Sequence, residues 1–201
     1  MIQYKNIFLI LNIMYGNKYN RVIRISSLET HIFNKTDSNP TYGELKKSGV
    51  NQLIKMLPQR KLNSFCDLGS GIGIVVKYIA ELTNYFTTIH GVELSEERYN
   101  VSLNLKKTIK NKSRKKQVKL FHHNILSFDV SNYDVLYISN LCFNHNFNKR
   151  LASKLNKECK PNCIIFASQD LIIERNHIKK HFPIDQSWGK NTQMFKYELI
   201  E

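Results

Sequence analysis

Residues 65–76 decide the fold, and they read Phe-Cys-Asp-Leu-Gly-Ser-Gly-Ile-Gly-Ile-Val-Val. The first apolar run ends in an acid, Asp67, and three glycines follow at alternate positions, Gly69, Gly71 and Gly73. Because glycine has no Cβ, a backbone with glycines at this spacing can adopt positive φ and approach a ligand closely. A second apolar run follows at once. The stretch therefore predicts a strand, a ligand-binding turn and a helix.

The spacing of the glycines argues against a dinucleotide site. A dinucleotide fingerprint places its third glycine three positions after the second, where this chain has Ile74. An acid before the first of three alternate glycines resembles instead the first motif of class I methyltransferases, which holds the methionine part of S-adenosylmethionine. The resemblance implies that this cofactor is bound by Asp67, Gly69, Ser70, Gly71 and Gly73.

A second acid, Glu93, ends the next apolar run, residues 87–92. A carboxylate at the end of a strand can accept both hydrogen bonds of a ribose diol. We favour this role because parallel strands bring Glu93 beside the glycine turn, although an acid also suits the start of a helix at Ser95. After the following strand, Asn124 and Ile125 stand where class I methyltransferases contact adenine. Asn124 could accept a bond from the adenine amino group or cap a loop.

From residue 64 onward, short β-branched or aromatic runs alternate with amphipathic stretches of helical length. This pattern predicts an α/β, Rossmann-like class I methyltransferase sheet, mostly parallel with a C-terminal antiparallel addition and with helices on both faces. We expect strands near residues 64–68, 87–93, 117–122, 133–138, 162–168 and 192–199. We expect helices near residues 73–83, 95–110 and 146–158. Residues 172–181 are not assigned.

The chain has the length of one domain, which we divide into two parts. Residues 1–43 are expected to form an N-terminal arm that covers the cofactor cleft, and residues 44–201 the catalytic domain. The apolar run Ile7 to Met14 is too short to span a bilayer. It is expected to pack on the domain as a strand or helix, because no small-residue cleavage site of a signal peptide follows it.

The chain is strongly basic, with 30 Lys and Arg against 16 Asp and Glu and a formal net charge of +14. The charge gathers between Lys106 and Lys119, a segment that also contains Lys107, Lys110, Lys112, Arg114, Lys115 and Lys116 and no acid. Such a cluster favours an anionic partner, which could be a nucleosome, a nucleic acid such as DNA or RNA, or an acidic surface. A solvated helix end and loop in a chain of biased composition would look similar.

Beyond these features, the chain resembles the disruptor-of-telomeric-silencing family, histone lysine methyltransferases that lack a SET domain. The matching segments are Tyr42-Gly43-Glu44 before a helix containing residues 50–54, the glycine turn with Gly91-Val92-Glu93, Ser139 to Phe143, and Ser187-Trp188. Ser139 replaces the first asparagine of the family's Asn-Asn-Phe-Ala-Phe motif, and Phe195 stands where the family has tyrosine. The resemblance implies that Tyr42, Glu44 and Asn140 contact the cofactor.

The same resemblance implies methyl transfer to a lysine of the nucleosome core. Methyl transfer to an amine is an in-line displacement, so the protein must align a neutral nucleophile and exclude water, without a metal or strong base. Asn140 is expected to hold the amine through its side-chain or backbone oxygen. Phe143, Trp188 and Phe195 are expected to form an apolar sleeve that favours neutral lysine. For Trp188, packing in the core is the alternative.

The chain has four cysteines, two of them within apolar runs. Reduced buried thiols are therefore expected, in an intracellular protein of the nucleus or cytoplasm. Cys159 and Cys163 precede His177 and His181 with thirteen residues between the pairs, the spacing of a Cys₂His₂ zinc site. Because we expect Cys163 in a strand and the histidines on a helix, we favour interior thiols and no metal.

Two further functions fit the sequence. The core motifs are common to class I enzymes that methylate RNA or small molecules. A binding module without catalysis could use the fold and the segment from Lys106 to Lys119 to hold a nucleosome or nucleic acid. We favour a monomeric S-adenosylmethionine-dependent histone lysine methyltransferase that does not associate with membranes.

Overall fold

The computed structural model describes residues 25–200 of the chain. The helices are α3 (Ser27–Thr36), α4 (Lys47–Lys55), α5 (Ile74–Leu82), α6 (Glu96–Lys107), α7 (Lys112–Gln117) and α8 (His145–Glu158). The strands are β1 (Ser64–Leu68), β2 (Thr88–Glu93), β3 (Val118–His122), β4 (Val135–Ile138), β5 (Ile164–Ala167), β6 (His177–Gln186) and β7 (Gly189–Leu199).

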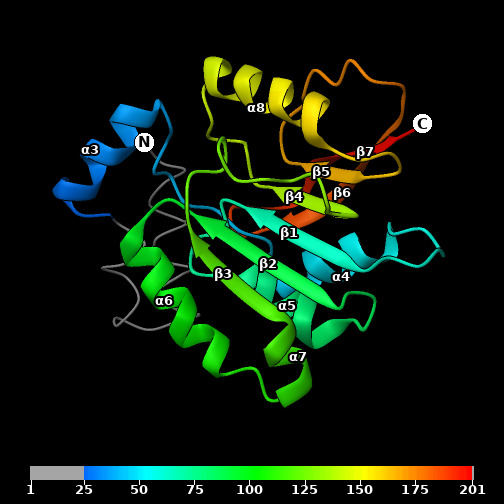
Figure 1. The fold of residues 1–201 in the computed structure, drawn as a ribbon, viewed down its shortest axis with the longest axis horizontal. Helices are drawn as coiled ribbons and strands as arrows, with labels where there is room; N and C mark the ends of the chain where they lie inside the picture. Colours follow the sequence, from blue (N-terminus) through cyan, green and yellow to red (C-terminus); the bar gives the residue numbers. More distant parts are fainter. Residues whose placement is uncertain (1–24, 201) are drawn as a thin grey trace.

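The strands form one seven-stranded sheet in the order β3-β2-β1-β4-β5-β7-β6 (Figure 1). The first five strands are parallel, whereas β7 runs antiparallel to both β5 and β6. The strand order reverses between β1 and β4. In open parallel sheets, ligands bind in the crevice outside the carboxyl ends of the strands at such a reversal.

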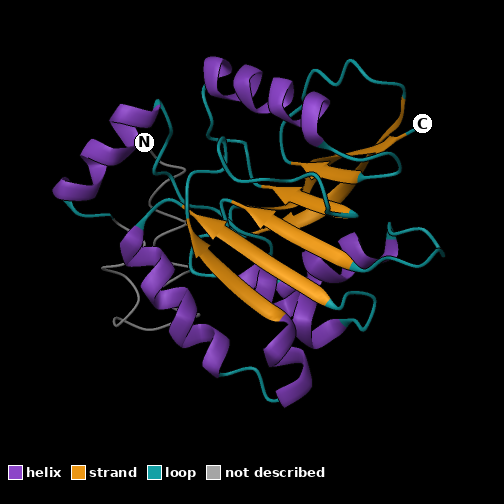
Figure 2. Ribbon diagram, viewed as in Figure 1, coloured by secondary structure: helices purple, strands orange, loops and turns teal. Residues whose placement is uncertain are grey.

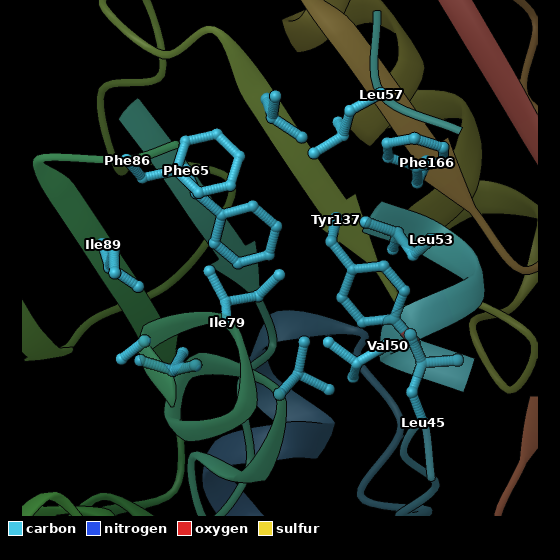
Figure 3. Packing of buried hydrophobic residues seen from close by; sticks show 14 of the residues in the cluster. Leu45, Val50, Leu53, Leu57, Phe65, Ile79, Phe86, Ile89, Tyr137 and Phe166 are labelled. Atoms are coloured by element: carbon cyan, nitrogen blue, oxygen red, sulfur yellow. The ribbon is translucent and has the colours of Figure 1, made fainter. Parts of the chain in front are cut away.

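Alternation along the central strands gives the sheet two apolar faces. Phe65, Tyr137 and Phe166 join the cluster that packs against α4 and α5. Figure 3 shows Phe65 near Ile79 of α5, and Tyr137 near Val50 of α4. The sequence neighbours of these strand residues, such as Leu136, point to the other face and pack against α8. Figure 2 shows the helices on both sides of the sheet. Successive residues of a strand point to opposite faces, so strands buried on both faces must be apolar throughout.

The mostly parallel sheet with an antiparallel C-terminal addition is confirmed. The expected strands and helices of the core begin and end within three residues of those observed. Of the unassigned residues 172–181, the last five belong to β6. The periodicity did not reveal them because the chain is exposed at Ile178 to His181 of this edge strand, so apolar alternation is missing there. The segment 112–117 is a short helix, α7. The arm contains α3, while the run Ile7 to Met14 lies outside the described residues.

Between residues 25 and 200, the helices are all too short or too polar to cross a bilayer.

Candidate active site

The glycine turn between β1 and α5 lies at the carboxyl edge of the sheet. Gly69 and Gly71 have φ of +88° and +55°. The backbone N–H groups of Gly69 and Ser70 both donate to the carbonyl of Val92 at 2.9 Å, which ties the turn to β2. At residue 71 only glycine fits, because a Cβ there would lie 2.1 Å from Cε2 of Tyr42. The ring of Tyr42 therefore lies directly against the turn.

Glu93, at the end of β2, supports both the turn and the next helix. Its Oε2 accepts from the N–H of Gly71 at 2.7 Å, and its Oε1 accepts from the N–H of Ser95 at 2.9 Å. The residue is only 5% exposed. Each carboxylate oxygen can accept a further hydrogen bond. Glu93 thus takes part in the start of α6, as the alternative interpretation expected, and its role toward a ribose stays a prediction.

Two more carboxyl groups are buried beside Glu93. Asp67 is 2% exposed, and its Oδ1 has no hydrogen-bond partner among the described residues. Burial, and then the neighbouring Glu93 and Glu44, raise the pKa of Asp67 well above its ordinary value. Glu44 accepts a hydrogen bond from the hydroxyl of Tyr42. An unsatisfied buried acceptor among acids favours a ligand that carries a cation or hydrogen-bond donors.

A cavity lies above this edge of the sheet, between the core and the arm. Its core wall consists of Gly69, Gly71, Glu93, Leu94, Arg98, Asn124, Ile125, Ser139, Phe143 and Phe147. Its outer wall comes from the arm, with Phe33, Ser38, Asn39, Thr41, Tyr42 and Gly43. The chain segments that meet here are up to about a hundred residues apart, so the cavity exists only in the folded protein.

Seven of the residues proposed from the sequence line this cavity. They are Tyr42, Gly69, Gly71, Glu93, Asn124, Ile125 and Phe143. The others, Glu44, Asp67, Ser70, Gly73, Asn140, Trp188 and Phe195, are not among its lining residues. Sequence reasoning missed Phe33, Arg98 and Phe147, because each has the residue type and spacing of an ordinary helix surface or core position.

Asn124 combines both roles considered for it. Its Oδ1 accepts from the N–H of Leu126 at 2.9 Å, so the side chain caps the loop after β3. The residue also lines the cavity next to Ile125, which is 6% exposed. The loop-cap interpretation is confirmed, and the contact with adenine stays a prediction.

The side chain of Asn140 is held by hydrogen bonds within the protein, and its contact with the amine or the cofactor stays a prediction. Its Oδ1 accepts from the N–H of Gln169 at 2.9 Å, and its Nδ2 donates to Oδ1 of Asn148 at 2.9 Å and to the carbonyl of Gln169. The residue is fully buried. Its backbone carbonyl accepts from the N–H of Phe143 at 3.1 Å. Asn140 thus braces the segment that carries Phe143, because a buried amide must pair its donors and acceptor.

Trp188 and Phe195 are not among the residues that line the cavity. Trp188 occupies the turn between β6 and β7, and a Cβ on Gly43 would lie 2.2 Å from its ring, so the indole packs on the arm. Phe195 is on β7, where Lys179 Nζ lies 5.3 Å from its ring centroid. The expected apolar sleeve therefore contains Phe143 from the predicted set, joined by the ring of Phe147 at 4.8 Å between centroids.

The zinc spacing does not bring its four residues together, and no group of three or more His, Cys, Asp or Glu in the described part of the chain is arranged to hold a metal ion. His177 and His181 lie on β6, not on a helix as expected. Strand β7 separates β6 from β5, which Cys163 precedes. Cys159 and Cys163 are buried free thiols.

The arrangement of sheet, turn and cavity can be compared with known proteins. A family model described as histone methylation protein DOT1 matches residues 19–197. The chain belongs to the DOT1 family. This membership confirms the resemblance seen in the sequence.

Among relatives of this DOT1 chain is the histone-lysine N-methyltransferase, H3 lysine-79 specific, of Dictyostelium discoideum. It is 24% identical over 144 residues, a match that covers 67% of the chain but only 8% of that protein. A methyltransferase from Geobacter sulfurreducens has the same fold, with a TM-score of 0.61, 10% identity and 87% of each chain covered. An RNA methyltransferase from Salinibacter ruber, in complex with S-adenosyl-L-homocysteine, has a TM-score of 0.55 and 16% identity over 76% of this chain and 90% of its own. The class I methyltransferase fold is thus confirmed.

Proposed function

We propose that this DOT1-family chain is an S-adenosylmethionine-dependent methyltransferase that acts on a lysine of a histone in the nucleosome. The observation that carries the proposal is the glycine turn, tied to Glu93, which opens into a cavity at the strand-order reversal. The substrate named for the relative from Dictyostelium is a proposal for this chain, since the match spans a small part of that protein. A histone substrate implies that the protein acts in the nucleus.

The residues at the site suit this cofactor. The unpartnered buried Oδ1 of Asp67 offers an acceptor for an ammonium group. The lone pairs left on Glu93 suit a ribose diol, and Asn124 with Ile125 lies where the base would rest. When bound, S-adenosylmethionine supplies an electrophilic methyl group. Glu44, Ser70 and Gly73 are proposed to support the turn from behind rather than to touch the cofactor.

The chain's own residues have two tasks in the reaction. The first is to exclude water, for which the rings of Phe143, Phe147 and Phe33 supply apolar surface around the cavity. Burial in such surroundings lowers the pKa of a lysine amine, so the neutral nucleophile is favoured. The second task is positioning. Asn140 holds the segment of Phe143, and Trp188 holds the arm at Gly43.

The basic segment is the proposed contact with nucleosomal DNA. Figure 1 shows α6 starting at the carboxyl ends of β2 and β3 and running toward α7 at their amino ends, so the lysines lie away from the cavity. Arg114 is withdrawn from this surface, because it is buried and donates to the carbonyls of Ala80, Thr83 and Phe86. No ion pair between described residues involves a lysine of the segment. These cations remain available for phosphate.

The test is methyl transfer from isotope-labelled S-adenosylmethionine to nucleosomes, free histones and RNA in parallel. Lysine methylation of the nucleosome is expected. Transfer to RNA alone would replace the substrate, and cofactor binding without transfer to any substrate would leave a binding module. Monomeric behaviour is expected in each assay.

A triple variant, Lys110→Gln with Lys112→Gln and Lys116→Gln, tests the DNA contact. Each lost phosphate contact should reduce the slope of log affinity against log salt by about 0.9, so about 2.7 for the three. Lys160→Gln provides a control, because Lys160 is ion-paired with Asp134 at 2.7 Å and lies outside the segment.

A further inference from the structure

The arm forms one wall of the cavity. Phe33, Ser38, Asn39, Thr41 and Tyr42 make the wall that faces the glycine turn. A nucleoside held against the turn would therefore lie between the arm and the sheet. The contacts that hold the arm in place therefore bear on how such a ligand enters and leaves.

The first contact joins α3 to the start of α6. Oε1 of Glu29 accepts from the N–H of Glu97 at 2.9 Å, and Oε2 accepts from the hydroxyl of Ser95. Glu29 is 7% exposed. A carboxylate at a helix N-terminus satisfies free N–H groups and interacts favourably with the helix dipole. The contact is between residues more than sixty positions apart, so it holds a separate segment in place.

This contact continues into the turn. Ser95, which donates to Glu29, also donates its N–H to Glu93, and Glu93 in turn accepts from the N–H of Gly71. Tyr42 of the arm then packs on Gly71 from the other side. The hydrogen bonds and the packing form a closed loop that begins and ends on the arm.

The second contact centres on Arg98. Its guanidinium lies 5.1 Å from the ring centroid of Tyr42 and 6.0 Å from that of Phe33, and it donates to the carbonyl of Pro40. Arg98 is 4% exposed, so its charge is desolvated and the stacking with aromatic rings is correspondingly stronger. The described part of the arm is thus attached to the start of α6 at two places, Glu29 and the segment from Pro40 to Tyr42.

A third contact is weaker. At the end of α3, Asp37 accepts from Nδ2 of Asn144 at 2.9 Å and pairs with Arg150 at 3.3 Å. The side chains of this ion pair are 51% and 48% exposed. Exposed pairs of this kind contribute little to stability.

We propose that residues 26–43 form a strap that must lift for the cofactor to enter and leave, and that Glu29 and Arg98 are the latches that hold it closed. The proposal rests on the proposed function, because the ligand of the cavity is taken to be S-adenosylmethionine or its product. Loosening a latch raises the open population of both the free and the liganded protein. Association and dissociation then accelerate together, and the affinity hardly changes.

The test measures association and dissociation rates of S-adenosylhomocysteine by stopped flow, using the full chain and its variants. Glu29→Gln replaces one accepting oxygen by a donor and removes the charge, and Arg98→Lys keeps the charge but loses the planar stacking group. Each variant should accelerate dissociation about tenfold, the equivalent of about 1.4 kcal/mol. For Glu29→Gln, which lies outside the cavity lining, association should accelerate by the same factor, so that the dissociation constant stays within about threefold. Without ligand, amide exchange in residues 27–42 should accelerate by a similar factor, while β1 is unchanged.

Glu96→Gln is the matched control. It makes the same chemical change in the first turn of α6, which Glu29 contacts from α3, but Glu96 is exposed and its side chain has no hydrogen bond to the described part of the arm. Its rates should equal those of the unmodified chain. Faster dissociation without faster association in Glu29→Gln, or unchanged rates in both latch variants, refutes the strap even though the protein still binds the ligand. If the unmodified chain does not bind S-adenosylhomocysteine, the proposed function fails, and the strap with it.

Discussion

Replacing Gly71 by alanine tests whether the arm packs on the glycine turn. The φ of +55° places an L-residue in the left-handed region, which costs about 1–2 kcal/mol. The new Cβ would also lie 2.1 Å from Cε2 of Tyr42. The Tyr42 ring cannot easily change rotamer, because its hydroxyl donates a hydrogen bond to Glu44 and the guanidinium of Arg98 lies over its face. Forced overpacking of this kind adds about 1–3 kcal/mol.

The two costs can be separated in a double-mutant cycle. In the presence of Tyr42, Gly71→Ala should lower the free energy of unfolding by about 2–5 kcal/mol, the sum of both effects. In a Tyr42→Ala background only the backbone cost of about 1–2 kcal/mol should remain. Urea unfolding, followed by circular dichroism, measures all four proteins.

Gly69→Ala is the control for backbone strain, because its nearest heavy atom, Cζ of Phe143, would lie 3.9 Å from the new Cβ. The cost of Gly69→Ala in free energy of unfolding should be the same with Tyr42 and with Tyr42→Ala. An equal cost of Gly71→Ala with and without the tyrosine ring would refute the packing of the arm on the turn.

Three further predictions concern buried ionisable groups. The pKa of Asp67 is raised in the folded state, so the folded protein loses stability as pH rises above the pKa that Asp67 has in the unfolded chain. Asp67→Asn should therefore raise the free energy of unfolding at pH 7. The same variant should bind the cofactor more weakly, as measured by calorimetry. Burial, and then Lys119, lower the pKa of His90 to about 4. The stability present above the unfolded pKa is therefore lost as pH falls from about 6.5 to 4, and His90→Phe should flatten urea-unfolding profiles in that window. Arg114→Ala leaves three carbonyls near the end of α5 without their donor. It should lower the free energy of unfolding, measured by thermal denaturation, by about 3 kcal/mol, whereas Lys112→Ala at an exposed site should leave it unchanged.

Much of the site was predictable because its signals are local. The glycines follow Asp67 directly, and Glu93 ends the neighbouring strand, so their meeting follows from parallel pairing alone. The contacts of Asn140 could not be predicted in this way. An asparagine after a strand can point into a cleft or into the loops beside it, and the positions of Asn148 and Gln169 decide which.

The amino-acid sequence by itself determined the order of strands and helices and the place of the turn, since apolar periodicity and glycine act over a few neighbouring residues. It also indicated the antiparallel C-terminal strand, through the alternation in residues 192–199. Only the tertiary structure decided which face α3 covers, that Glu29 meets the start of α6, and that Arg98 and Phe147 join the cavity. These contacts link segments far apart in the chain, so they depend on how the packed layers are oriented, a property that no local pattern encodes.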